Sequence, residues 1–329
     1  MILKPETASR LAERYRIVRE NPLTKRALAI GHWALLGLII AFLVYRLTHI
    51  GWSDVARSLP SSPWFYVFFL LRYLTLPVTE TAVYESIWNR PVVAHLPAFI
   101  RKRVYNYAVA GYSGEGFLAL WARRRLGLSD RDAIVGIKDN SILGSLTANV
   151  ATVGVVVALA IGGGLDEGFA LLPGAQALFA VSFCAAATMS AAVVIFRRRL
   201  IALPEPKARK VIAIHVVRQT MNLTLFAAMY AAAIPSESFG TWFWFIGLQL
   251  VISRIPFLPN QDLVYLTAAL SFASLVGAPR EAVAGMLVAE AGLSMLFSIC
   301  LFLATLYLAR RGAGPVPIKV AGARLNEAA

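Results

Sequence analysis

The sequence predicts an all-α membrane bundle, because it is strongly apolar and its apolar residues lie in long runs. Of 329 residues, 58% are hydrophobic and 15% are charged, and the mean hydropathy is +0.65. Soluble domains contain about 25% charged residues. Several runs approach or exceed the roughly 20 apolar residues that a helix needs to cross a bilayer. A soluble globular domain is therefore excluded.

Six apolar runs have the length of complete transmembrane helices. They are residues 27–47, 63–82, 141–161, 175–196, 211–234 and 282–308. We divide the chain into an amphipathic N-terminal segment at the cytoplasmic surface (1–26), one transmembrane domain (27–310) and a cytoplasmic tail (311–329). The N-terminal segment has apolar residues on one helical face and arginines elsewhere, which suits the anionic cytoplasmic leaflet. Its role could be anchoring alone.

The basic residues cluster at the ends of the apolar runs. Seven lie in residues 1–26, nine in 90–138, six in 197–210 and four from 310 onward, whereas Arg57 and Arg280 alone occupy the opposite loops. This asymmetry follows the positive-inside rule. It predicts a multi-pass protein of a bacterial inner membrane with both termini in the cytoplasm. It also explains the net charge of +14 without nucleic acid as a partner.

Two further apolar stretches are interrupted. Residues 104–121 have basic triplets on both sides, so both ends should face the cytoplasm, which predicts a re-entrant hairpin. Residues 240–277 break at 254–262, where Pro256 and Pro259 end one half-helix before another begins. This predicts a second hairpin that enters from the outside. Two ordinary short spans are the alternative for 240–277, because they give the same parity of crossings.

A short motif occurs in both halves of the chain. Arg131-Asp132-Ala133 is followed by a glycine at 136, and Arg280-Glu281-Ala282 is followed by a glycine at 285. The charge pattern assigns the two copies to opposite sides of the membrane. Opposite orientation is typical of inverted-repeat transporters. Because the matched window is short, coincidence is the alternative.

Polar residues within the apolar segments are the candidates for binding a substrate. An ionisable residue at membrane depth costs about 2.5–3.5 kcal/mol on insertion scales and usually faces a cavity or a partner. A half-helix that starts inside the membrane presents unpaired N–H groups to anions, and arginine adds bidentate phosphate contacts. The candidates are Asn106, Ser113, Glu115, Arg218, Asn222, Arg254, Asn260, Asp262 and Glu290.

Structural explanations compete with these roles. Glu115 and Asp262 could cap helices, and Glu290 and Arg254 could each belong to a structural buried pair. A polar stripe that runs along one helical face from His215 to Asn222 could instead dock another membrane protein.

Enzyme signatures are weak. We expect no metal and no cofactor, since the four histidines and two cysteines lack the spacing of metal ligands. Asp130 and Asp132 form the D-x-D pattern that holds a metal–sugar-nucleotide in glycosyltransferases. The same residues could simply cap the following helix.

The motifs together resemble the transmembrane domain of the lysylphosphatidylglycerol synthase/flippase family, which also occurs as stand-alone flippase-like proteins. The similarity involves Asn106, Gly114-Glu115, the basic residues 123–125 with the turn at 127–129, and the segments 256–262 and 282–308. The chain departs from the family where 258–262 replace a glycine-rich tip. It departs again where Glu290 stands near the place of a typical arginine.

The resemblance implies a flippase that moves an anionic phospholipid or a polyprenyl-phosphate-linked lipid between leaflets. A membrane lipid is then the expected partner, and a homo-oligomer or enzymes of envelope biosynthesis are further candidates. The alternative is a membrane-embedded enzyme or accessory subunit of glycolipid or envelope-polymer synthesis.

Overall fold

The computed structural model describes residues 52–108, 112–162, 169, 174–255 and 261–311, and these form helices without any β-strand. The predicted all-helical class is confirmed for this part of the chain. The predicted span 27–47, the N-terminal segment 1–26, the tail from 312 and Asn260 lie outside the described residues.

Helices of very different lengths follow one another along the described part of the chain. From the N-terminus they are α3 (Trp52–Arg57), α4 (Pro63–Trp88), η1 (Val93–His95), α5 (Leu96–Ala108), α6 (Ser113–Leu126), α7 (Asp130–Ile161), α9 (Ala175–Ile195), α10 (Arg197–Leu200), α11 (Glu205–Ala233), α12 (Phe239–Ile252), α13 (Gln261–Ala269), η2 (Leu270–Leu275) and α14 (Arg280–Arg311).

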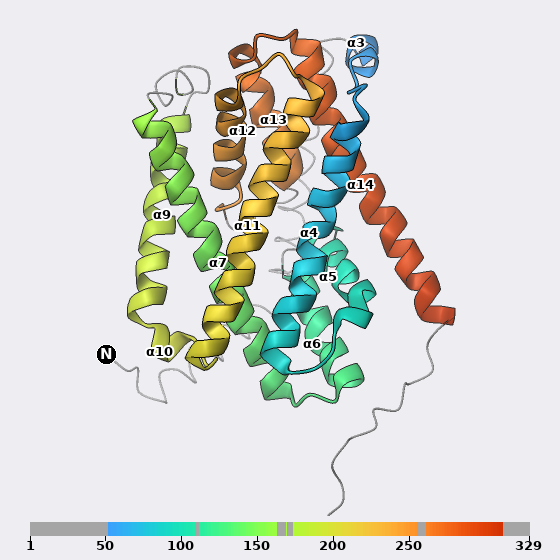
Figure 1. Cartoon of the computed structure of the whole chain (residues 1–329), viewed down its shortest axis with the longest axis vertical. Helices are drawn as coiled ribbons and strands as arrows, with labels where there is room; N and C mark the ends of the chain where they lie inside the picture. The colour runs from blue at the N-terminus through green and yellow to red at the C-terminus, as the bar shows by residue number, and fades with distance from the viewer. Residues whose placement is uncertain (1–51, 109–111, 163–168, 170–173, 256–260, 312–329) are drawn as a thin grey trace, which may run out of the picture.

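Long helices form the frame of the bundle, and two pairs of short helices fill opposite ends of it. Figure 1 shows α4, α7, α9, α11 and α14 running its length, with α5 and α6 in the lower half and α12 and α13 in the upper half. Helix α4 packs along α11 at the centre. Helix α5 packs on α14, and α12 packs on α7, so each short pair contacts the long helix that follows the other short pair in the chain.

Local sequence signals place the helix ends around the short pair α5–α6. Helix α6 ends at Gly127, whose φ of 64° is the left-handed conformation that glycine adopts without strain. Two residues later the Ser129 hydroxyl accepts a hydrogen bond from the Asp132 N–H at 3.1 Å and caps α7. Helix α4 ends at Trp88, and Asn89, the residue that follows, has a left-handed φ of 49°.

Several helices extend beyond the apolar runs that predicted them. Helix α9 agrees with the predicted span 175–196, but α7 begins at Asp130 rather than at 141, α4 continues from 82 to Trp88, and α5 begins at Leu96 rather than at 104. The extra turns contain charged residues, some of which contact other helices of this chain. A hydropathy window excludes such turns because it measures their charge and not their burial against other helices of the same chain.

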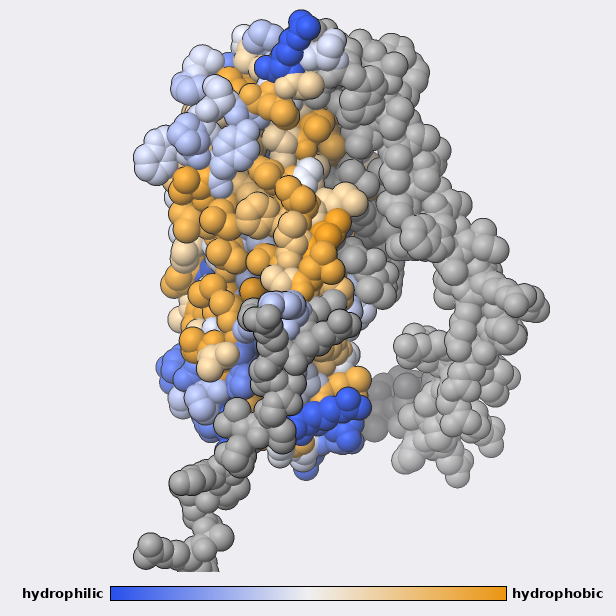
Figure 2. Space-filling model, turned by 90° about the vertical axis from the view of Figure 1, so that its right-hand side faces the viewer, coloured by the Kyte–Doolittle hydropathy of each residue, from blue (hydrophilic) through white to orange (hydrophobic). Residues whose placement is uncertain are grey.

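The long helices indicate a membrane protein. By length and composition, four described helices could cross a membrane: Asp130–Ile161, Gln176–Ile195, Glu205–Ala233 and Arg280–Thr305. Figure 2 shows an apolar band on one face of the bundle between more hydrophilic ends. Large apolar side chains such as Val181, Met189 and Leu303 are exposed, which a lipid environment accommodates and water does not.

Candidate functional site

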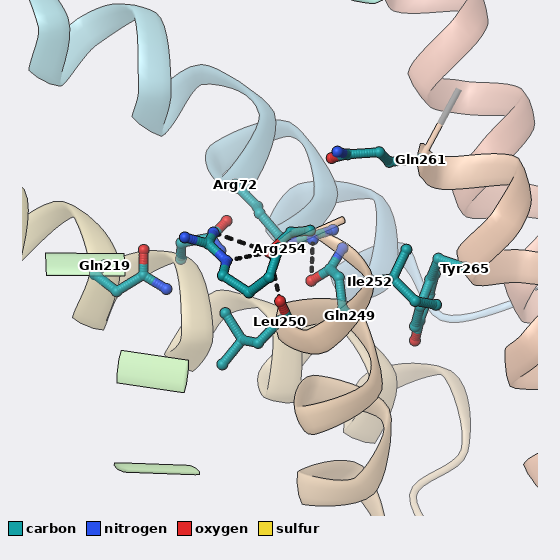
Figure 3. Close-up of a pocket in the computed structure, with 10 residues that line it drawn as sticks. Arg72, Gln219, Gln249, Leu250, Ile252, Arg254, Gln261 and Tyr265 are labelled. Carbon is teal, nitrogen blue, oxygen red and sulfur yellow. Dashed lines mark hydrogen bonds between the residues drawn. The ribbon is translucent and has the colours of Figure 1, made fainter. Parts of the chain in front are cut away.

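A polar cavity of about 210 Å³, which we call the central cavity, lies where α12 ends and α13 begins. Figure 3 shows its side chains arriving from four helices: Arg72 from α4, Gln219 from α11, Gln249 from α12 and Gln261 from α13. The polar lining comprises Arg72, Gln219, Asn222, Gln249, Ser253, Arg254, Gln261 and Tyr265. No carboxylate belongs to this lining, so among the described residues the wall of the cavity carries only positive formal charge.

Arg254 directly follows α12 and holds its guanidinium with neutral partners. Its Nη1 donates to Asn149 Oδ1 at 2.8 Å, and its Nε and Nη2 donate to the Ser253 hydroxyl at 3.2 and 3.0 Å. The C-terminal end of a helix favours a cation. Arg254 has no ion-pair partner in the described part of the chain, so its charge is available to an anion in the cavity.

Arg72 also lines the cavity, and its charge is balanced within the protein. Its Nη1 forms an ion pair with Glu290 Oε1 at 2.5 Å, and its Nη2 donates to Gln249 Oε1 at 2.9 Å. The other Glu290 oxygen accepts a 2.6 Å hydrogen bond from the Tyr230 hydroxyl, which also contacts the Tyr265 hydroxyl at 2.9 Å. Glu290 is thus a buried structural partner of Arg72 rather than of Arg254.

A second buried polar cluster joins α4, α5 and α6. The Lys102 ammonium of α5 forms ion pairs with Glu80 of α4 and, at 3.2 Å, with Glu115 of α6. Lys102 is only 4% exposed, so the basic triplet 101–103 is not a fully solvated flank of the hairpin, as the charge pattern suggested. The cluster ties the α5–α6 pair to the central helix α4.

Asn106 and Ser113 also join α5 to α6. Asn106 Oδ1 accepts from the Gly114 N–H, and the Ser113 hydroxyl donates to the Tyr105 carbonyl, both at 2.7 Å. Neither residue lines the central cavity, and neither does Glu115. Three of the predicted binding residues therefore hold the tip of the α5–α6 pair together.

The polar stripe of α11 faces the interior of the bundle. Gln219 and Asn222 line the cavity, and the buried His215 Nε2 lies 3.0 Å from Asn140 Oδ1. Arg218 lies beside Gly144, where an added Cβ would be 3.6 Å from its Nη2, and it has no ion pair with a described residue. Because this chain itself covers much of the stripe, the contacts argue against a docking surface for another protein.

Of the predicted binding residues, the cavity contains Asn222 and Arg254, and Glu290 supports it through Arg72. Asp262 is the second residue of α13, but its side chain lies outside the described set, as does all of Asn260. The prediction missed Gln249, which is the one amide in the otherwise apolar α12. A single amide in such an apolar helix indicates a hydrogen bond to another helix, so the sequence could have predicted the role of Gln249.

The D-x-D residues have separate structural partners. Asp130 forms an ion pair with Arg123, and Asp132 Oδ2 accepts a 2.7 Å hydrogen bond from the Ser129 hydroxyl. These contacts agree with a helix cap. Within the described residues, no group of three or more histidine, cysteine, aspartate or glutamate side chains could hold a metal.

No protein-family model matches the sequence, and no curated protein matches it either. The described residues form a helical bundle in which four helices have membrane length, with an arginine-lined cavity at the end of α12.

Proposed function

We propose that the chain is a lipid transporter that moves an anionic, phosphate-bearing lipid between the leaflets of a bacterial inner membrane. The substrate would be a phospholipid or a polyprenyl-phosphate-linked lipid. The observation that carries this proposal is Arg254, a guanidinium at the cavity whose partners among the described residues are all neutral. A cation in such a low-dielectric place attracts an anion strongly.

The rest of the cavity suits a lipid head group. Gln219, Asn222 and Gln249 provide amide donors and acceptors for phosphate oxygens and for hydroxyl groups. The N-terminal end of α13 at Gln261 adds a partial positive charge. A volume of about 210 Å³ is smaller than a drug-sized pocket. The head group would enter while the hydrocarbon chains stay in the bilayer.

We also propose six spans with two re-entrant hairpins, α5–α6 and α12–α13, that enter from opposite sides. Helices α5 and α12 contain 13 and 14 residues, or about 20 Å each, against a hydrocarbon core of about 30 Å. Their location in opposite halves of the bundle supports this arrangement. Both termini would then be cytoplasmic.

The repeated motif supports a related origin of the two halves. An added Cβ at Gly136 of α7 would lie 2.5 Å from Trp88 Nε1, and one at Gly285 of α14 would lie 2.3 Å from the Ser58 carbonyl. Each copy therefore uses its glycine for a close approach in the second turn of a long helix. Alternating exposure of the cavity would follow from one half moving against the other.

The transport proposal can be tested with the purified protein in liposomes. We expect it to accelerate the movement of fluorescent phosphatidylglycerol or of a labelled prenyl phosphate, measured by quenching of the outer leaflet. Arg254→Gln should slow this movement about tenfold or more, because it removes a charged hydrogen-bond donor worth about 1.5–3 kcal/mol.

Arg280→Gln is the matched control, since Arg280 is exposed and does not line the cavity. It should transport at the rate of the unaltered protein. If neither lipid moves faster than in protein-free liposomes at any pH or membrane potential, the proposed function is wrong. If Arg254→Gln transports normally, the cavity is not the binding site.

A further inference from the structure

A second cavity, of about 520 Å³, opens at the basic end of the bundle, which carries the arginines at 123–125 and 197–199. It lies between the end of α4, the first turns of α7 and the loop that leads into α11. Arg90, Arg131 and Lys207 contribute three cations to its wall. It shares no lining residue with the central cavity.

The three cations keep their charges unpaired within the part of the chain that the structure describes. None of them forms an ion pair with a described residue, although two carboxylates lie in the same wall. Asp132 is engaged by the Ser129 hydroxyl and caps α7. Asp139 is fully buried and accepts hydrogen bonds from the backbone N–H groups of Ala202 and Leu203, both at 2.9 Å.

Asp139 thereby gives the cavity a fixed shape. Its two bonds hold the loop before α11 against α7, and the Lys138 ammonium also donates to the Leu200 carbonyl at 2.6 Å. The same loop supplies Leu203 and precedes Lys207. The cations are therefore carried by an anchored wall rather than by a free surface segment.

Trp88 closes the inner wall of the cavity. Trp88 lines the cavity and is 8% exposed, and its indole N–H is buried with no acceptor among the described residues. The indole nitrogen packs directly over Gly136, where an added Cβ would lie 2.5 Å away. The indole thus packs the end of α4 tightly against α7, and the cations are the polar groups that this wall presents to a ligand.

We propose that this cavity is a binding site for a phosphate group, with Arg90, Arg131 and Lys207 as its cationic contacts and Trp88 as its inner wall. Guanidinium and ammonium groups are the usual protein partners of phosphate. The phosphate could belong to a lipid head group at the membrane surface or to a soluble phosphate compound. The proposal does not depend on transport through the central cavity.

The test compares two triple variants of the full chain in detergent. Arg90→Gln/Arg131→Gln/Lys207→Gln removes the cavity cations, and Arg124→Gln/Arg198→Gln/Arg199→Gln removes three exposed charges from the same end. Native mass spectrometry with dioleoylphosphatidic acid measures lipid binding, with dioleoylphosphatidylcholine for comparison. Thermal unfolding in inorganic phosphate, against chloride at equal ionic strength, measures binding of free phosphate.

We expect the cavity variant to bind at least about tenfold more weakly in one of these arms, while the control binds normally. A loss in the lipid arm alone identifies a head-group site, and a loss in the inorganic phosphate arm identifies a soluble ligand. Trp88→Phe, which keeps all three cations and an aromatic inner wall, should bind like the unaltered protein. Binding should persist in Arg254→Gln, which separates this site from the central cavity.

Two results would overturn the proposal. One is an equal loss in both triple variants, because binding would then depend on the general charge of this end. The other is no binding of either probe to the unaltered protein. If the triple variant does not fold, Arg131→Gln alone gives the same comparison against Arg124→Gln.

Discussion

The two arginines of the central cavity carry their charges in different ways. Arg72 shares its charge with Glu290, and that pair belongs to a network with Tyr230 and Gln249. Within the described residues, the partners of Arg254 are an amide and a hydroxyl. We therefore assign Arg72 and Glu290 to the construction of the site and Arg254 to the ligand.

This assignment predicts a stability defect when Glu290 is changed to leucine. The variant leaves the Arg72 charge without its carboxylate and the Tyr230 hydroxyl without its acceptor. Removing one member of a buried ion pair typically costs about 3–5 kcal/mol. Reversible unfolding of the purified protein in mixed micelles would measure the loss.

Two comparisons make the stability measurement specific. Arg72→Leu/Glu290→Leu should recover most of the lost stability, because no isolated charge remains. Glu281→Leu, in the first turn of the same helix, should cost at most about 1 kcal/mol. A double variant no more stable than Glu290→Leu alone would contradict the assignment of this pair.

At the scale of elements, the α5–α6 pair depends on one close backbone approach. Gly114 donates its N–H to Asn106, and an added Cβ at Gly114 would lie 2.1 Å from the Lys102 carbonyl. A backbone atom cannot move aside as a flexible side chain does. The same contact between α5 and α6 keeps Lys102 of α5 between Glu80 of α4 and Glu115 of α6.

Gly114→Ala should therefore separate the two helices. Overpacking of this kind costs about 1–3 kcal/mol, and the shift should also weaken the ion pairs of Lys102. Gly116→Ala is the control in the same helix, because nothing lies within 4 Å of its added Cβ. Helix propensity should make Gly116→Ala neutral or slightly stabilising. Unfolding measurements that rank the two variants in reverse would refute this description of the hairpin.

At the scale of the whole molecule, the helices up to α9 form the first half of the chain and those from α11 onward form the second. Contacts between these two halves determine which residues meet at the central cavity. Arg254 follows α12 from one half and bonds to Asn149 of α7 from the other. Glu290 of α14 likewise pairs with Arg72 of α4. Each half therefore holds a cavity arginine of the other.

The proposed topology predicts which side of the membrane labels introduced cysteines. After Cys184 and Cys300 are replaced by alanine, cysteines at 90 and 124 should react with an impermeant maleimide only from the cytoplasmic side. Cysteines at 236 and 280 should react only from the outside, because they flank the α12–α13 pair.

A cysteine at 261 separates a hairpin from two short spans. A re-entrant hairpin keeps residue 261, at the start of α13, away from the cytoplasmic surface, so a bulky maleimide added on that side should not label it. Two full spans would expose the connection there and allow labelling. Labelling of positions 90 and 124 from opposite sides would rule out the hairpin α5–α6.

The sequence by itself determined the helical class, four of the six predicted membrane-length helices and the break after α12. These follow from local properties, namely long apolar runs and prolines that cannot continue a helix. It also singled out Arg254, Asn222 and Glu290, since a polar residue in an apolar run is conspicuous. The sequence did not predict that helices begin at Leu96 and Asp130, because the first turns of these helices are charged and do not have the composition of a transmembrane segment.

Only the tertiary structure decided which of these residues meet. Glu290 pairs with Arg72, 218 positions away, and Lys102 lies between carboxylates from two other helices. Such pairs depend on how the helices pack, and no spacing along the chain encodes that packing directly. The same packing gave Arg254 neutral partners among the described residues and placed it, unlike the predicted candidate Arg218, in the lining of the central cavity.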